Sequence, residues 1–432
     1  MGEREPVAAA PAVAGGPAGQ VRPLFPWLVL GLSFALLLSD FMCRQVLAAV
    51  FPLLKTEWAL SDAQLGALTS VVALTVGVLT LPLSILADRF GRRRAILCMA
   101  VVWSLATLAS ALATGYGQLL LARVFVGAGE AAYGSVGLAV VLSVFPAHRR
   151  AALAGTFTAG SFFGSALGVA LGGALAVRYG WRWSVAATAV IGLVLALLYR
   201  QVITEGRLAA HEVTEPSTGS APGRTGRSRL VSLLSPPAVR YAYVGGGLQL
   251  FVGGTLLAWL PSYLHRDYGL TVGAAAGLAS LLLLGMAVGM IACGLLTDRL
   301  ARAAPARTWT TAMGYAAASM LLLGVGFSLS PGAAQLALIG AGAFFAAGTN
   351  GPVSALVADL TPASVRASAF GVLALCFNLL GLSTGPLVVG VLADRLGLSA
   401  AMRLVPAVSL VVLVVLAAGR HAYRAGVRHT SP

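Results

Sequence analysis

Apolar stretches of about 20 residues, each separated from the next by a short polar break, repeat from Trp27 to Arg420. Lipid offers no partner to backbone N–H and C=O groups, so such stretches must be helices or strands of a closed barrel. They lack the period-two alternation of strands and are too long for barrel strands, which predicts helices. We place the helices at 27–51, 63–87, 95–114, 118–145, 151–177, 182–200, 238–264, 272–297, 308–328, 333–358, 366–393 and 400–419.

Composition excludes a soluble protein. The 432 residues are 58% hydrophobic and 10% charged, whereas a soluble domain carries about 25% charged residues. We therefore expect an all-α polytopic membrane protein with twelve transmembrane helices, in two pseudo-symmetric bundles of six. The expected domains are a disordered tail at 1–22, bundles at 23–200 and 237–420, a polar Pro/Gly/Ser-rich linker at 201–236, and a second tail at 421–432.

Two short segments of the first half recur in the second. FPAHRRAALAG at 145–155 matches TPASVRASAFG at 361–371, and EWALS at 57–61 matches DYGLT at 267–271. Matching loops at matching points indicate a duplicated six-helix unit. Such halves rock about a site near the middle of the membrane and expose it to each side in turn.

Basic residues are distributed unevenly between the two sides. The net charge is +15, and with a cytoplasmic amino terminus 21 of the 29 Lys and Arg residues lie on the cytoplasmic side, 6 outside and 2 within helices. The positive-inside rule predicts this bias. We therefore expect a bacterial-type inner-membrane protein with both termini in the cytoplasm. Because the charge is a topology signal, we expect no nucleic-acid partner.

Motifs for catalysis, metal binding and ATP binding are absent from the sequence. No GxxxxGK[ST] loop is present, and neither the cysteines nor the histidines have the spacing of metal ligands. The four cysteines, which all lie in apolar stretches, are expected to be free thiols. We expect a protein that is not an enzyme, uses no ATP and no cofactor other than protons as coupling ion, and works as a monomer.

The loop after the second predicted helix reads SILADRFGRRR, from Ser84 to Arg94. It resembles the signature loop G-x-x-x-D-R-x-G-R-R/K of the major facilitator superfamily, with Ser84 in place of the usual glycine. The resemblance implies the major facilitator fold and a cytoplasmic gate latch; a role in topology alone is the other interpretation. The candidate gate residues are Asp88, Arg89, Arg92 and Arg93, their second-half counterparts Asp298 and Arg299, and the matched loop arginines Arg150 and Arg366.

Four charged residues lie at mid-depth in predicted helices of the first half: Asp40, Arg44, Arg123 and Glu130. A charge at this depth costs at least about 2.5 kcal/mol, so these groups should face a cavity and pair. Desolvation favours the protonated carboxyl group and a nearby arginine favours the carboxylate, so motion can change proton occupancy. We therefore expect Glu130 to be the principal proton acceptor, with Asp40 second. A permanent ion-pair network that fixes helix packing is the alternative.

The fourth predicted helix contains GAGE, ending at Glu130, and the first contains FMCR, ending at Arg44. Both resemble the Spinster (lysophospholipid and sphingolipid transporter) branch of the superfamily, although Cys43 stands where that branch has Asp. The resemblance implies an amphiphilic, lipid-like substrate. The expected cavity residues are Tyr133, whose hydroxyl we expect to bond Glu130, and Gln249, Trp259, Thr349, Asn350, Phe377 and Asn378.

Several functions stay open at this point. Proton-linked transport of a lysophospholipid-like amphiphile leads, since the second half offers a largely apolar wall opposite the charges. Multidrug efflux by proton antiport would use the same cavity with looser contacts. Organic-anion/proton symport would call for an arginine at depth in each half, and the second half has none. A sensor or scaffold that has kept the fold is the fourth possibility.

Glycine recurs every fourth residue from Gly160 to Gly172 in the fifth predicted helix, and the eleventh contains Gly385-Pro386. Small residues allow helices to approach closely. The ridge is therefore either a flexible seam between the halves or simple close packing.

Overall fold

The computed structural model describes residues 24–146, 149–211, 235, 237–303, 306–362 and 365–430. Within these ranges the chain is helical and without strands, and twelve helical segments are long and apolar enough to cross a membrane. This confirms the all-α polytopic fold.

The first half contains helices α1 to α7. Their bounds are Leu24–Trp58 (α1), Asp62–Phe90 (α2), Arg92–Leu112 (α3), Tyr116–Glu130 (α4), Tyr133–Ser143 (α5), Arg150–Tyr179 (α6) and Trp181–Val202 (α7). The single helix expected at 118–145 is therefore interrupted directly after Glu130.

The second half repeats this order with more interruptions. Its elements are α10 (Pro237–Tyr268), α11 (Val272–Ala303), α12 (Arg307–Ser328), α13 (Ala333–Gly348), α14 (Asn350–Leu360), α15 (Arg366–Cys376), the π-helix η3 (Phe377–Ser383), α16 (Thr384–Leu396), α17 (Leu398–Leu404), the 3-10 turn η4 (Val405–Ala407) and α18 (Val408–Thr430). The helix expected at 366–393 thus contains a π-helical segment. Such segments are rare and recur at functional sites.

Most helices extend beyond the apolar stretches that predict them, because a helix can continue where lipid ends and water begins. The first extends to Trp58 instead of residue 51. The expected linker 201–236 contains the short helix α8 (Glu205–His211), and α18 continues through the expected tail to Thr430. The expected tail 1–22 lies outside the described residues.

The duplicated sequence segments occupy equivalent places. Glu57 near the end of α1 accepts a hydrogen bond from Trp181 at the start of α7 (2.6 Å). Asp267 near the end of α10 accepts one from Ser399 at the start of α17. Each half therefore ties the end of its first helix to the start of its sixth in the same way.

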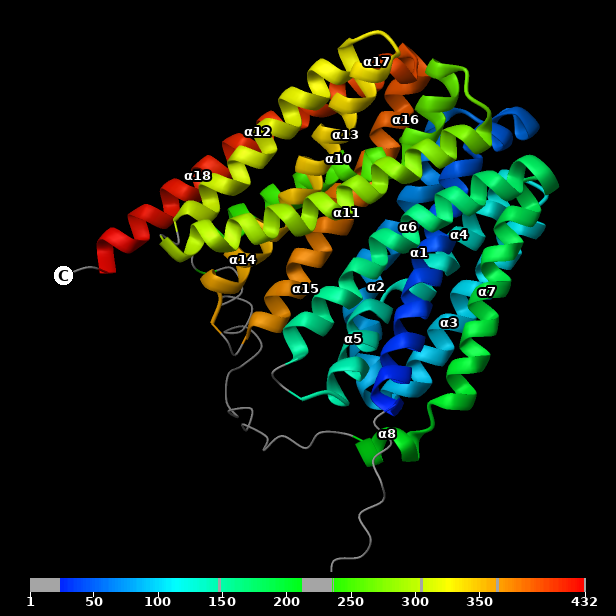
Figure 1. Cartoon of the computed structure of the whole chain (residues 1–432), viewed down its shortest axis with the longest axis horizontal. Coiled ribbons are helices and arrows are strands. Elements are labelled where there is room, and N and C mark those ends of the chain that lie inside the picture. Colours follow the sequence, from blue (N-terminus) through cyan, green and yellow to red (C-terminus); the bar gives the residue numbers. More distant parts are fainter. Residues whose placement is uncertain are drawn as a thin grey trace, which may run out of the picture.

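Two ends of the molecule differ in how closely the halves approach. We call the end where α1 and α10 finish, at Trp58 and Tyr268, the clamp end, and the opposite end, where α7 finishes at Val202, the linker end. In Figure 1 the halves converge at the clamp end near α16 and diverge toward the linker end, where α12 and α18 point away from α3 and α7. Between the halves, α2 packs on η3 and α16, and α6 packs on α11.

The glycine ridge of α6 packs mainly within the first half. A Cβ added at Gly164 would meet the carbonyl oxygen of Leu38 at 2.7 Å, and one at Gly168 would meet the Cα of Met42 at 2.7 Å, both in α1. This supports the close-packing interpretation for that ridge. Gly173, one residue beyond it, instead lies against Ala276 of α11, across the interface.

Candidate functional site

The buried charges of the first half lie together. Arg44 Nε in α1 is 3.9 Å from Glu130 Oε2 at the end of α4, and the Glu130 side chain is only 2% exposed. Asp40, one turn before Arg44, is also buried and lies beside Glu130. Both carboxyl oxygens of Glu130 and Oδ1 of Asp40 have no hydrogen-bond partner in the part of the chain that the structure describes. Buried polar atoms are usually paired, so these orphaned oxygens mark a site of function or water binding.

Arg123 has a different role from the one expected. Its guanidinium is fully buried and donates to three backbone carbonyls, those of Cys43 (3.1 Å), Arg44 (3.0 Å) and Leu68 (3.5 Å). Arg123 makes no ion pair with Glu130 among the described residues, whereas Arg44 does. Arg123 therefore joins α4 to α1 and α2 through their backbones.

The hydrogen bond expected between Tyr133 and Glu130 is not formed. The Tyr133 hydroxyl donates to the carbonyl oxygen of Ser33 (2.7 Å), and its ring packs edge-on against Trp103. The prediction assumed a continuous helix, which would place Tyr133 one turn beyond Glu130. Because α4 ends at Glu130 and α5 starts at Tyr133, that spacing does not hold, and Tyr133 lies in the packed core instead.

Arg44 faces a small cavity between the halves. The first half contributes Arg44, Gln45, Thr69 and Ala73, and the second contributes Gly254, Leu257, Ala258, Leu382 and Pro386. The guanidinium of Arg44 also donates to Asn378 Oδ1 in η3 at 3.5 Å. Neither Asp40 nor Glu130 lines this cavity, so Arg44 is the group that connects it to the buried carboxyl groups.

Trp259 and Thr349 do not face the cavity. The indole of Trp259 is fully buried, donates to the carbonyl oxygen of Pro386 (3.0 Å) and packs on Phe51 of the other half. It therefore forms part of the seal between the halves. The Thr349 hydroxyl donates to the carbonyl oxygen of Phe345 in the preceding helix α13 (3.3 Å).

Three further second-half candidates, Gln249, Asn350 and Phe377, also lie outside the lining of this cavity. Gln249 is 1% exposed, and both polar atoms of its amide lack a hydrogen-bond partner, as does Oδ1 of Asn350. Phe377 stands at the start of η3 and packs beside Gly246. Their part in substrate binding therefore stays a prediction.

The candidate gate residues form no bridge between the halves in the described part of the chain. Asp88 pairs with Arg92 four residues away (3.6 Å), and both side chains are largely exposed. Arg93 donates to the carbonyl oxygens of Arg200 (2.9 Å) and Ile203, which fixes the loop to the end of α7. Arg89, Asp298, Arg299 and Arg366 are exposed, and the side chain of Arg150 lies outside the described residues. The latch therefore stays a prediction.

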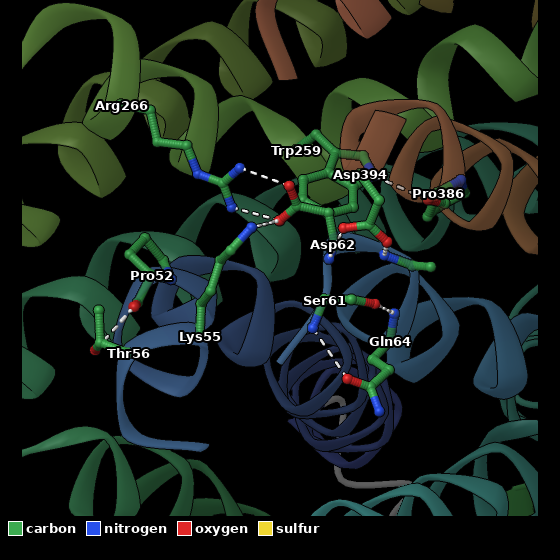
Figure 2. A network of polar contacts seen from close by, with 11 residues as sticks. Pro52, Lys55, Thr56, Ser61, Asp62, Gln64, Trp259, Arg266, Pro386 and Asp394 are labelled. Carbon is green, nitrogen blue, oxygen red and sulfur yellow. Dashed lines mark hydrogen bonds and ion pairs between the residues drawn. The ribbon is translucent and has the colours of Figure 1, made fainter. Parts of the chain in front are cut away.

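A bidentate ionic contact that no sequence pattern predicted joins the halves at the clamp end (Figure 2). Arg266 of α10 donates to both carboxylate oxygens of Asp62, at 2.8 and 2.6 Å. Lys55 Nζ lies 2.7 Å from the same carboxylate, whose side chain is 4% exposed. Two parallel charge-assisted bonds fix direction as well as distance.

Asp394 of α16 completes this contact from the second half. Its carboxylate accepts hydrogen bonds from the backbone N–H groups of Asp62 (2.6 Å) and Ala63 (2.9 Å), the first residues of α2. Ser61 and Gln64 cap the same helix start reciprocally. An anion at a helix N-terminus is favoured by the exposed N–H groups and the helix dipole.

We call Lys55, Asp62, Arg266 and Asp394 the clamp. The partners that it joins are 204 and 332 residues apart in the sequence. The only sequence signal is the presence of acids beside bases at positions assigned to the outer side, and nothing in that pattern selects the pairs.

Two repeated six-helix halves, joined at one end and holding buried charges between them, define a polytopic secondary transporter. The sequence matches the Major Facilitator Superfamily over residues 32–379, and the chain belongs to that family.

The relatives fall into two groups. The D-galactonate transporter of Escherichia coli is 27% identical over 410 residues, which cover 89% of this chain and 93% of that protein. Protein spinster homolog 1 of Xenopus laevis is 28% identical over 246 residues, which span only 46% of its length. The hexuronate transporter of Bacillus subtilis is 25% identical, and the match spans 61% of it.

Among solved structures, a bacterial homolog of the human lysosomal transporter Spinster, in an inward-facing and unoccupied conformation, has a TM-score of 0.79. Its sequence is 20% identical, with 93% of this chain and 98% of that chain covered. This likeness confirms the fold.

Proposed function

We propose that this transporter couples proton movement to the movement of an amphiphile with an anionic head group, such as a lysophospholipid. Glu130 takes the proton, assisted by Asp40, and Arg44 binds either the Glu130 carboxylate or the substrate. The observation that carries the proposal is the environment of Glu130: its buried carboxyl oxygens have no hydrogen-bond donor among the described residues, and it lies beside both Arg44 and Asp40.

This arrangement links the two ligands through one cation. When Arg44 turns to an anion in the cavity, Glu130 loses the cation with which it pairs while Asp40 stays beside it, and its neutral, protonated form becomes favoured. When the substrate leaves, Arg44 is free to return, and the proton is released. The 3.9 Å separation, longer than a direct bond, leaves Arg44 room to make this exchange.

The walls of the cavity favour a substrate with a polar head and an apolar tail. The charged group comes from the first half, whereas the second half contributes Leu257, Ala258, Leu382 and Pro386. Asn378 adds one amide beside Arg44. The sphingosine-1-phosphate transporter SPNS2 of Danio rerio, which is similar to this chain, is named for a lipid of this class and supports the proposal.

A small organic anion is the second candidate. It is supported by the D-galactonate transporter, whose match to this chain extends over most of both sequences. The absence of a second-half cation among the cavity residues counts against a carboxylate held from both sides.

Alternating access follows from the clamp in this proposal. The halves are bonded at the clamp end and diverge toward the linker end (Figure 1), so in this proposal the substrate pathway is closed at the clamp end in this state. The opposite state requires the clamp to separate. We further propose that the linker end faces the cytoplasm of a bacterial cell and that one chain forms the whole pathway.

Proteoliposomes test the proposal. Labelled lysophosphatidylglycerol, D-galactonate and a cationic drug are each offered with and without a proton gradient. We expect gradient-driven accumulation of the lysophospholipid, and we expect Glu130→Gln to keep substrate exchange while it loses the response to the gradient. Asp359→Asn, which removes an exposed carboxylate of α14, should behave as wild type.

The outcomes separate the parts of the proposal. Accumulation of D-galactonate alone would establish the second candidate, and accumulation of the drug alone would indicate efflux. Flux that ignores the gradient in the wild-type protein, or an unchanged gradient response in Glu130→Gln, would contradict proton coupling through Glu130.

A further inference from the structure

The outer surface of the first half is hollowed on both sides of α3 near the linker end. A hollow of about 290 Å³ lies between α2 and α3, and one of about 530 Å³ lies between α3 and α7. Their walls are almost entirely apolar, with exposed Leu86 and Leu197 among them. Neither shares a residue with the cavity at Arg44.

Two arginines stand at the linker-end rim of these hollows. Arg94 lines both of them, and Arg200 lines the larger one. Arg94 is the third residue of α3 and Arg200 the third from the end of α7, so both lie where the helices leave the apolar layer. Val101 and Leu193, about two turns deeper in the same helices, continue the wall below them.

The two guanidinium groups are only partly neutralised. Arg94 pairs with Glu205 of α8, with Nε 2.9 Å from Oε1. The Arg200 guanidinium makes no hydrogen bond or ion pair with the described residues, although its backbone carbonyl accepts a bond from Arg93. The rim therefore has more positive than negative charge, at the depth of lipid phosphates.

We propose that this surface is a binding site for one anionic phospholipid of the adjacent leaflet. Its phosphate lies between Arg94 and Arg200, and its acyl chains follow the apolar walls of the hollows. Arginine binds phosphate through paired charge-assisted bonds, and basic pockets between helices select anionic head groups. The phosphate joins α3 to α7 through Arg94 and Arg200. Because Arg94 also pairs with Glu205, the same site is connected to α8.

Charge complementarity selects this occupant over an ordinary lipid of the bilayer. Any phospholipid can place a chain in an apolar groove, but a zwitterionic head group brings its own cation to the rim. Phosphatidylglycerol and cardiolipin bring anionic charge without a cation. The selectivity between head groups, at fixed acyl chains, is therefore what the site predicts.

Cys98 provides a reporter inside the site. It lines both hollows, and it is the exposed one among the four cysteines, since Cys43 and Cys293 are buried and Cys376 is half-buried. Delipidated wild-type protein is treated with a maleimide in detergent, with phosphatidylglycerol or with phosphatidylcholine of matched chains. We expect phosphatidylglycerol to slow alkylation of Cys98 at least threefold more than phosphatidylcholine does. Inorganic phosphate should give no protection.

Variants then test the two arginines. Arg200→Gln and Arg94→Gln should remove the difference between the two lipids, and native mass spectrometry should show less retained phosphatidylglycerol. Arg178→Gln, an exposed arginine at the clamp end of α6, is the matched control and should keep the difference. Equal protection by both lipids in the wild-type protein, or a difference that persists in Arg200→Gln, would overturn the proposal. The wild-type comparison decides even if a variant fails to fold.

Discussion

Buried polar residues in this transporter differ in how well their hydrogen bonds are satisfied. Arg123 has three carbonyl partners, whereas Glu130 and Asp40 have buried oxygens without any. A satisfied group stabilises one arrangement of helices, and an unsatisfied one is left for a partner that comes and goes. The contrast separates Arg123, which positions helices, from Glu130 and Asp40, for which we propose a role in transport.

Arg123→Gln tests the positioning role. The variant leaves the carbonyls of Cys43, Arg44 and Leu68 without their donor in a buried place, so we expect a loss of stability on the order of 3 kcal/mol. Thermal unfolding in detergent, followed by size-exclusion fluorescence, measures it. Arg44→Gln, at a partly exposed side chain, should unfold near the wild-type temperature while transport is lost. Equal stabilities of the two variants would contradict the distinction.

Gln249→Leu tests an orphaned amide. Both polar atoms of Gln249 are buried without partners, so an apolar side chain of similar size should leave stability unchanged or raise it by about 1 kcal/mol. We expect transport to fall, because the amide is reserved for the substrate or for another state. A lowered melting temperature in the same assay would show that Gln249 is bonded in solution.

Sequence reasoning at this scale found the depth of the charges but not their partners. An acid or a base in an apolar stretch is visible in the sequence, and Asp40, Arg44 and Glu130 do lie together. The predicted hydrogen bond from Tyr133 to Glu130 was wrong because the helix breaks at Ala131 and Ala132, and the break changes the direction of the Tyr133 side chain. Alanine is a strong helix former, so propensity gives no warning of such a break.

Among elements, glycines set how closely the halves can approach. Gly66 of α2 lies directly against the backbone of Pro386 at the start of α16, so this crossing between halves has no room for a Cβ. The same holds for Gly173 against Ala276. Both contacts lie toward the clamp end, so we expect them to separate when that end opens.

Gly66→Ala should therefore favour the state open at the clamp end. A Cβ forced against a backbone costs about 1–3 kcal/mol, which shifts a two-state equilibrium by roughly fivefold to a hundredfold. Alkylation of Thr69→Cys from the clamp side, in a Cys98→Ser background, measures the exposure of the cavity. Gly277→Ala, on α11 with nothing within 4 Å of the added Cβ, is the control and should leave the rate unchanged. An unchanged rate in Gly66→Ala would contradict the argument.

The sequence predicted twelve spans because lipid thickness imposes a length on each apolar stretch. It did not predict the π-helix at Phe377 or the interruptions at Glu130 and Thr349. Those depend on contacts with other helices, as between Asn378 and Arg44, and a hydrophobic pattern contains no record of them.

For the whole molecule, the clamp is the contact whose rupture must accompany opening. Asp62→Asn leaves Lys55 and Arg266 close together without their shared carboxylate, so two partly exposed like charges face each other across the halves. We expect the two halves to move apart at the clamp end in this variant. Spin labels at Thr114→Cys and Ser330→Cys, one on each half with Cys98 replaced by serine, measure that distance.

The control for this experiment is Arg182→Gln, which breaks the pair with Glu57 inside the first half at the same end. It should leave the distance distribution unchanged, because no bond between the halves is lost. A longer distance in both variants would mean that general destabilisation, and not the clamp, controls opening.

At this scale the sequence predicted the two halves from the repeated loops at 57–61 and 267–271. The sequence did not predict how one half packs against the other. The predicted gate lies at the linker end, where Asp88 is exposed, whereas the bonded end is the opposite one. Charge counts on each side give topology, but they do not say which side is closed.

One helix connects the two ends. α2 is held at its first residues by Asp394 and Arg266, and its last turn carries Asp88 and Arg89, free of the second half. At 1.5 Å per residue it is about 43 Å long, so a small tilt about its middle moves its tips in opposite directions. The helix then acts as a lever. The end of α2 that is docked on the second half determines which side of the transporter is closed. A nanobody that binds at the Asp62 end of α2 would therefore hold the clamp end closed and stop transport without contacting the substrate.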